Sequence, residues 1–142
     1  SPKILLRRVA PAVMAALDVE RRWALNAVYC LVPRPGISPR ALLGVLNSSV
    51  PSFWLRAVFL SDDRLFPYLR LSQLALLPLP DLAGTAAPVL VELEELVERR
   101  MAARGEEAGT LDERIDAVAA ELYGLGEDDR AAVATCGPRS RR

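Results

Sequence analysis

The sequence changes character after Asp81, and this change constrains the fold more than any other feature. Before Asp81, prolines divide the chain into short apolar stretches, which is typical of strands and short helices. After it, apolar residues recur at helical spacing. We therefore expect an α/β (α+β) fold, with a small mixed or antiparallel sheet and packed helices in residues 1–82. A helical hairpin is expected in residues 83–136 and a basic tail in residues 137–142.

Three segments near the N-terminus are candidates for the sheet. Residues 3–9 alternate weakly between two prolines, which predicts a short strand. Residues 12–17 are rich in alanine, so they fit either a second strand or a short helix. Residues 24–32 contain Val, Tyr and Leu and predict a buried strand. We expect this strand to pair antiparallel with its predecessor across a turn at residues 18–22.

Two helices and one further extended segment are expected before residue 82. Ser38 is a good N-cap and proline follows it at the first helical position, so a helix is predicted over residues 39–47. Pro51 should break or restart this helix, which places a second one over residues 52–60. The apolar run 74–79 ends in Pro-Leu-Pro and predicts a strand or an extended edge segment.

The acidic segment predicts a hairpin of helices. A helix over residues 88–104 has a narrow apolar seam formed by Leu90, Leu93, Val97 and Met101. Thr110 and Glu113 have the spacing of a capping box, which predicts that the next helix begins at Thr110. Gly124 is suited to end that helix, and a short final helix is expected over residues 127–134.

The net charge of zero is unevenly distributed. Residues 1–80 hold 10 Lys/Arg and 4 Asp/Glu, a net charge of +6, and residues 81–136 hold 5 and 14, a net charge of −9. The last six residues add three arginines. A basic half beside an acidic half indicates that only the first half meets a polyanion, although ordinary surface composition is the alternative.

Several kinds of site chemistry are excluded by the residues themselves. The chain has no histidine, which removes histidine-based triads and most zinc sites. Cys30 and Cys136 are far apart, and we expect Cys30 to pack as a small hydrophobic residue in a reducing, cytoplasmic protein. Neighbouring carboxylates such as Asp62 and Asp63 diverge, so they are better suited to turns than to acid–base catalysis. We therefore expect no catalytic centre, no metal site and no bound cofactor in this chain.

Neither a membrane nor a signal peptide is expected. The sequence has no uninterrupted apolar run of about 18 residues, the length needed to span a bilayer. It begins Ser-Pro-Lys, without a methionine and without the long apolar region of a signal peptide. We expect the chain to be part of a longer polypeptide.

Three ordered motifs carry a family resemblance. They are LGVLNSS followed by FW at residues 43–54, RLSQL running into LPLP at residues 70–80, and ERID followed by AELYGL at residues 113–125. In this order and spacing they resemble the TaqI-like C-terminal specificity region of adenine-N6 DNA methyltransferases. That group includes type IIG restriction–modification enzymes, in which a methylase and a nuclease are fused. The segment KILLRR at residues 3–8 also matches an upstream strand of the family, so the resemblance extends over about residues 3–134.

The resemblance implies a recognition role without catalysis. The family's Asn/Asp-Pro-Pro-Tyr/Phe motif and its glycine-rich S-adenosylmethionine loop are both absent from this sequence. We expect the parent polypeptide to be an S-adenosylmethionine-dependent DNA adenine-N6 methyltransferase, with or without an endonuclease. The methyl donor would bind its upstream domain. Recognition domains of the family begin earlier than Lys3, so we also expect part of the base-reading surface upstream.

The implied partners are double-stranded DNA and the catalytic domain of the same polypeptide. An adenine inside a duplex is unreachable, so it must be flipped out while a second domain grips the duplex and reads neighbouring bases. The candidate DNA-binding residues are Lys3, Arg7, Arg8, Arg34, Arg40, Arg56, Arg64, Arg70, Ser72 and Gln73. For each of these, an ordinary surface charge or helix cap is the alternative.

Two further features have simpler structural interpretations. For Asn47, Ser48 and Ser49 we favour hydrogen bonding at a helix end over contact with DNA. The aromatic residues Phe53, Trp54 and Phe59 are expected in the core rather than as platforms for stacked bases. The alternative function is a protein–protein interaction or scaffold domain of a phage-defence system, in which the fold is kept but DNA reading is lost.

Overall fold

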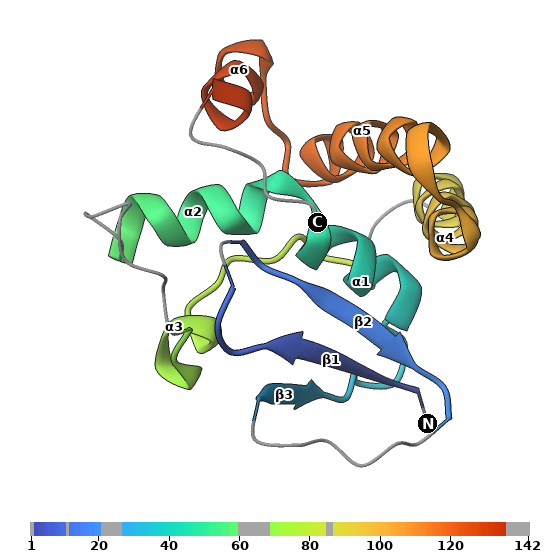
Figure 1. Ribbon diagram of the computed structural model, residues 1–142. Helices are drawn as coiled ribbons and strands as arrows, with labels where there is room; N and C mark the ends of the chain where they lie inside the picture. Colours follow the sequence, from blue (N-terminus) through green and yellow to red (C-terminus); the bar gives the residue numbers. More distant parts are fainter. Residues whose placement is uncertain (1, 11, 21–26, 60–68, 85–86, 136–142) are drawn as a thin grey trace.

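The computed structural model describes residues 2–10, 12–20, 27–59, 69–84 and 87–135. Within these residues it contains a small antiparallel sheet followed by helices, which confirms the α+β fold class (Figure 1). The strands are β1 (Lys3–Arg7), β2 (Ala15–Asp18) and β3 (Val28–Leu31). The helices are α1 (Pro39–Asn47), α2 (Ser49–Phe59), α3 (Leu71–Ala75), α4 (Ala87–Ala102), α5 (Gly105–Leu122) and α6 (Glu127–Thr135).

The strand order is β2-β1-β3, with β1 in the centre and antiparallel to both neighbours. The expected pairing of the third strand with its predecessor is therefore wrong, because Tyr29 of β3 lies opposite Leu6 of β1. β1 has the most deeply buried side chains of the three strands, Ile4 and Leu6, and burial on that scale favours the central position. Since β2 and β3 both run opposite to β1, they run parallel to each other, so no tight hairpin turn can join them as a pair.

The two faces of the sheet differ in burial. Ile4 and Leu6 point into the core, whereas Leu5 is only partly buried and its neighbour Cys30 is exposed. The expectation that the third strand is buried, with Cys30 packed inside, is therefore wrong. Successive side chains of a strand point to opposite faces. Tyr29 and Leu31 take the inner face, so Cys30 must take the outer one.

Helix α1 covers the inner face of the sheet and lies between it and α4, as Figure 1 shows. Ser38 Oγ accepts a hydrogen bond from the Ala41 amide at 3.2 Å, and Pro39 occupies the first turn, which confirms the predicted start. Every residue from Ala41 to Leu46 is buried. A Cβ on Gly44 would lie 2.8 Å from Val97 Cγ2, so glycine permits the close approach of α1 and α4.

Helix α2 begins at Ser49, three residues before the predicted start. Pro51 therefore lies inside the first turn, where proline is tolerated because its missing amide has no helical partner in any case. Trp54 and Phe59 pack against the core, and their rings meet edge to face at 5.7 Å between centroids.

The predicted strand at residues 74–79 is wrong. A short helix, α3, covers Leu71–Ala75, and the described chain after it forms no strand. Gln73 Oε1 accepts a hydrogen bond from the Arg70 amide at 3.1 Å, and this local contact favours a helical turn over an extended segment.

The hairpin of α4 and α5 was predicted correctly in outline but not in detail. Leu93, Leu96 and Val97 are buried, whereas Met101 is 44% exposed, so the apolar seam is displaced from the predicted one. Helix α5 begins at Gly105, and the predicted capping box is wrong because Thr110 lies within the helix, where its Oγ1 donates to the Glu106 carbonyl at 3.1 Å.

Burial accounts for the early start of α5. Ala108 is buried, so the added turn contributes to the core, and this gain offsets most of the cost of about 1 kcal/mol for Gly109 inside a helix. The end of α5 is as predicted. Gly124 has φ 73°, and its amide and that of Leu125 donate to carbonyls of the last turn at 3.0 Å.

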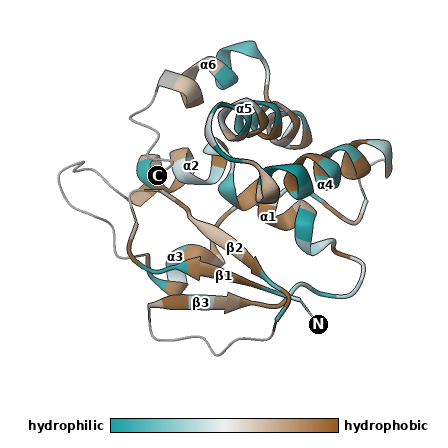
Figure 2. Cartoon of the chain, turned by 45° about the vertical axis from the view of Figure 1, so that its right-hand side comes forward, coloured by the Kyte–Doolittle hydropathy of each residue, from teal (hydrophilic) through white to brown (hydrophobic). Residues whose placement is uncertain are grey.

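One hydrophobic core includes residues from both halves of the chain, among them Leu6, Leu46, Leu93 and Leu111. The division into units at residue 82 stays a prediction. Figure 2 shows the sheet and α1 largely in hydrophobic colours, whereas hydrophilic residues are frequent on α4, α5 and α6. No single described helix is long and apolar enough to cross a membrane, and only the bent pair α1 and α2 has the length and composition for it.

Candidate nucleic-acid interface

Two adjoining depressions lie beside the segment that leads into β2. The smaller one is lined by Arg7, Arg56 and Gln73 together with apolar side chains. The larger one has a volume of about 420 Å³ and lies between β2, the junction of α1 and α2, and the helices α4 and α5. They share the lining residues Ala12, Val13, Ser52 and Arg56, so they are adjacent and we refer to them together as the groove. We call the two parts the small depression and the large cavity.

Helix α2 places Arg56 where the two parts meet. Ser52 Oγ accepts a hydrogen bond from the Val13 amide at 2.9 Å, which fixes α2 to the segment before β2. Arg56 follows Ser52 by one helical turn and therefore lies on the same face of α2. Its side chain is half-buried and lines both depressions.

The contacts of Leu69 place α3, and with it Gln73, beside the sheet. The Leu69 amide donates to the Arg8 carbonyl at 2.7 Å, and the Tyr29 hydroxyl donates to the Leu69 carbonyl at 2.9 Å. The Arg8 guanidinium lies over the Tyr29 ring, 4.8 Å from its centroid. Arg8 therefore supports the segment that carries Gln73.

Of the remaining candidates in the sheet and on α3, Arg7 lines the groove, whereas Lys3, Arg70 and Ser72 do not. Lys3 forms an ion pair with Asp18 at 3.4 Å at the far end of β1, and Asp18 is only 7% exposed. Arg7 ends β1 and is exposed, with its Nη1 3.9 Å from Met14 Sδ. Arg70 and Ser72 are exposed beside Gln73 on the α3 segment.

Three candidates lie elsewhere or outside the described residues. Arg34 is exposed in the turn before α1, and Arg40 is half-buried in the first turn of α1. Neither lines the groove. Arg64 lies outside the described residues. The structure thus brings together Arg7, Arg56 and Gln73, and DNA contact by any candidate stays a prediction.

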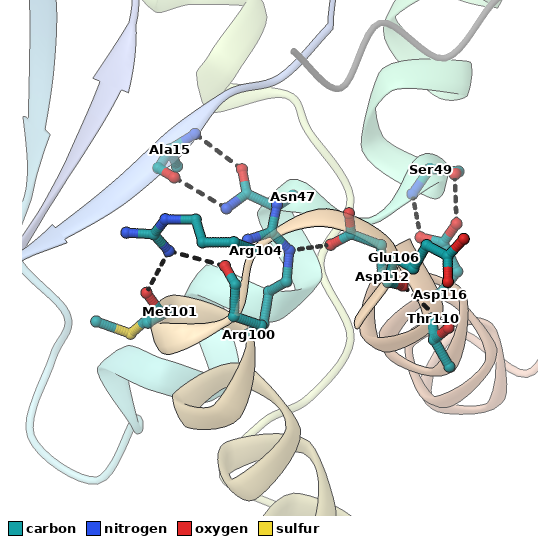
Figure 3. A network of polar contacts seen from close by, with 11 residues as sticks. Ala15, Asn47, Ser49, Arg100, Met101, Arg104, Glu106, Thr110, Asp112 and Asp116 are labelled. Atoms are coloured by element: carbon teal, nitrogen blue, oxygen red, sulfur yellow. Dashed lines mark hydrogen bonds and ion pairs between the residues drawn. The ribbon is translucent and has the colours of Figure 1, made fainter. Parts of the chain in front are cut away.

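Three residues of the family motifs, Asn47, Ser49 and Asp116, connect elements that are far apart in the sequence (Figure 3). Asn47 Oδ1 accepts from the Ala15 amide at 2.8 Å, and Asn47 Nδ2 donates to the Ala15 carbonyl at 2.9 Å. Ser49 donates to both carboxylate oxygens of Asp116, through its amide at 2.9 Å and its hydroxyl at 2.8 Å. The sequence predicted that these residues form hydrogen bonds at a helix end, and it did not predict their partners in distant elements. The family motif was the one feature of the sequence that singled these residues out.

The charged side chains that line the groove near the sheet are the arginines Arg7 and Arg56, whereas both arginine and aspartate line it near the hairpin. In the large cavity, Arg100 Nε donates to Asp112 Oδ1 at 2.8 Å, so this pair joins α4 to α5 (Figure 3). Within the described ranges, no group of three His, Cys, Asp or Glu side chains is arranged to hold a metal ion.

The fold and the groove define an α+β module that presents arginine and amide side chains on one side and an acidic helical segment on the other. The family model of the TaqI-like C-terminal specificity domain matches residues 1–79. The chain belongs to this family. The match ends before α4, so residues 113–125, which carry the third motif of the resemblance, lie outside it.

Among the curated proteins and the solved structures that were compared, none matches the chain. Membership of the specificity-domain family supports a role in DNA recognition within a restriction–modification system, beside a methyltransferase domain. A specificity domain is generally non-catalytic, which agrees with the missing methyltransferase motifs of this sequence.

Proposed function

We propose that this chain is the DNA-recognising portion of an adenine-N6 DNA methyltransferase of a restriction–modification system. It grips duplex DNA while a separate upstream domain methylates a flipped adenine. The observation that carries the proposal is the small depression, where β1, α2 and α3 contribute Arg7, Arg56 and Gln73 to one surface. Membership of the family supports the role in DNA recognition, and the geometry of the small depression supports this surface as the site of contact.

The two residue types at the small depression suit two different tasks. Arginine binds phosphate oxygens and fixes the register of a protein on the duplex. A glutamine amide can read a base edge in the major groove, and since Gln73 Oε1 accepts from the Arg70 amide, its Nε2 group is the part suited to that contact. Arg70 and Ser72 are exposed beside Gln73 and extend this surface along α3.

The charge distribution indicates how the module is oriented on DNA. Most of the acidic residues belong to α4, α5 and α6, and residues 81–136 hold 14 Asp/Glu against 5 Lys/Arg. Repulsion between these carboxylates and phosphates disfavours contact of the duplex with the outer, carboxylate-bearing surface of the hairpin. S-adenosylmethionine would bind the upstream domain, because the glycine-rich loop for it is absent from this sequence.

The test is binding of the chain to a mixed-sequence duplex at about 50 and about 200 mM salt, where phosphate contacts change affinity most visibly. We expect affinity to fall steeply with salt, and Arg7→Ala to reduce the slope of log K against log salt by about one. Arg114→Ala, an exposed arginine of the acidic hairpin, is the matched control and should leave the slope unchanged.

Arg8 is a poorer probe than Arg7, because removal of its side chain also removes the contact with Tyr29. Binding that does not depend on salt, or an Arg7→Ala slope equal to that of the control, would contradict the proposal. That result would favour the interaction module of a phage-defence system that keeps the fold without DNA reading.

A further inference from the structure

The large cavity has the size and composition of a site for a small organic ligand. Its volume of about 420 Å³ falls within the range of about 300–1,000 Å³ that is usual for such sites. Apolar walls from Leu43, Val97 and Ile115 lie beside a few polar groups, which is the usual lining of a site for a small organic molecule. The small depression alone is too small for this purpose, at about 30 Å³.

Arg56 makes the entrance of the cavity suitable for a phosphate. It lines both parts of the groove, so it borders both the surface proposed to hold the DNA backbone and the large cavity. A guanidinium binds phosphate oxygens with two parallel hydrogen bonds. A phosphate held at Arg56 would leave its attached sugar and base on the side of the cavity.

Phe53 supplies an aromatic wall inside the cavity. It precedes Arg56 by three residues on α2, so the two side chains are neighbours on one face of the helix. An aromatic ring beside an arginine is the combination by which proteins bind unstacked nucleotides, since every base has a flat face that stacks. Phe53 is half-buried, whereas Trp54 and Phe59 pack against the core.

The polar groups at the hairpin side of the cavity suit the edge of a base. Arg100 Nε and Asp112 Oδ1 are engaged with each other at 2.8 Å, so a base edge would meet the other guanidinium N–H groups of Arg100 and the remaining lone pairs of the Asp112 carboxylate. Adenine and cytosine have the complementary pattern, a ring nitrogen that accepts next to an amino group that donates. The Asn47 amide is engaged with Ala15 and serves to shape the wall.

We infer that the large cavity receives one unstacked nucleotide, with its phosphate at Arg56, its base against Phe53 and its polar edge toward Arg100 and Asp112. The inference deepens the proposed function and rests on it for DNA as the source of the nucleotide. A free mononucleotide has the same chemistry and is the other source. The cavity is thereby a second recognition site, distinct from base reading in the groove of the duplex.

The experiment compares two duplexes and one mononucleotide on the full chain. The duplexes are identical except that one contains a single unpaired adenosine nucleotide, and the mononucleotide is adenosine 5′-monophosphate. Affinity is measured for each duplex. The methyl signals of methionine are followed by NMR, because the only two methionines of the chain, Met14 and Met101, both line the cavity.

We expect the duplex with the unpaired nucleotide to bind about tenfold more tightly than the paired duplex, and the methionine signals to shift with it alone. Phe53→Leu keeps an apolar side chain but removes the ring, so it should abolish the preference and leave affinity for the paired duplex unchanged. Val58→Ala, an exposed position on the same helix, is the control and should keep the preference.

Each outcome decides between the two proposals. Equal affinity for both duplexes, with methionine signals that neither the unpaired nucleotide nor adenosine 5′-monophosphate shifts, overturns the cavity site while DNA binding stands. If neither duplex binds, the proposed function fails. In that case the cavity site is supported if adenosine 5′-monophosphate shifts the methionine signals of the unaltered chain but not those of the Phe53→Leu variant. It is overturned if the mononucleotide causes no such shift.

Discussion

Asp116 and Ser49 are 67 positions apart in the sequence, and two hydrogen bonds join them at the start of α2. One carboxylate oxygen of Asp116 accepts from the Ser49 amide at 2.9 Å, and the other accepts from the Ser49 hydroxyl at 2.8 Å. A carboxylate at a helix N-terminus satisfies an amide that has no helical partner and interacts favourably with the helix dipole. Asp116 therefore caps α2 from another helix, and α2 in turn carries Phe53 and Arg56 to the groove.

Replacement of Asp116 by alanine should lower the free energy of unfolding by about 2 kcal/mol, because two hydrogen bonds to a charged acceptor are lost. Asp116→Asn keeps an acceptor without the charge and should lose less. Urea unfolding measures both variants against Glu113→Ala, an exposed carboxylate one turn earlier on α5. Equal stability of the Asp116 and Glu113 variants would show that the cap contributes nothing.

The two hydrogen bonds between Asn47 and Ala15 predict how stability changes when the side-chain nitrogen of Asn47 is replaced by oxygen. Asn47→Asp keeps the acceptor for the Ala15 amide, but it places a second oxygen opposite the Ala15 carbonyl, where Nδ2 now donates at 2.9 Å. We expect a loss of about 1 kcal/mol in thermal or urea unfolding, at least as large as for Asn47→Ala. If the Asn47→Asp variant is as stable as the unaltered chain, the bond from Nδ2 is dispensable.

Two glycines on helices should respond in opposite directions to an added side chain. Gly44→Val places atoms where Val97 and Leu93 already lie, since a Cβ alone would be 2.8 and 2.9 Å from their side chains. This should cost about 1–3 kcal/mol of stability. Gly109 on α5 has nothing within 4 Å of such a Cβ, so Gly109→Ala should stabilise by about 0.5–1 kcal/mol through helix propensity. Denaturation midpoints test the pair, and a stabilising Gly44→Val would reject the close approach of α1 and α4.

Tyr123 should make stability depend on pH in the alkaline range. Its hydroxyl donates to the Pro78 carbonyl at 2.8 Å, and burial raises the pKa of Tyr123 above its ordinary value. The unfolded chain loses the tyrosine proton near pH 10, whereas the folded chain retains it. The stabilisation is therefore complete below pH 10 and is lost as pH rises above it. Tyr123→Phe should cost about 1 kcal/mol near pH 8 and flatten the decline above pH 10. Parallel curves of unfolding free energy against pH would contradict this account.

Helix ends could be predicted from the sequence where the residues that form the cap are neighbours in the chain. Ser38 and Pro39 specified the start of α1, Gly124 specified the end of α5, and the chemistry of a cap or a left-handed residue needs no distant partner. The same signals failed where packing opposed them. Thr110 has the spacing of a cap but lies inside α5, because the turn that precedes it buries Ala108 against the core and the helix extends back to Gly105.

The sequence by itself determined the fold class, the separation of basic and acidic halves, the absence of methyltransferase motifs and the family resemblance. Only the tertiary structure decided that β1 is central, that Cys30 is exposed, and that Arg7, Arg56 and Gln73 line one depression. It also decided that Asn47 joins the end of α1 to Ala15 of β2 and that Ser49 joins the start of α2 to Asp116 of α5. The physical reason is that strand order and the meeting of distant side chains depend on burial summed over the whole core, which no local pattern of residues encodes.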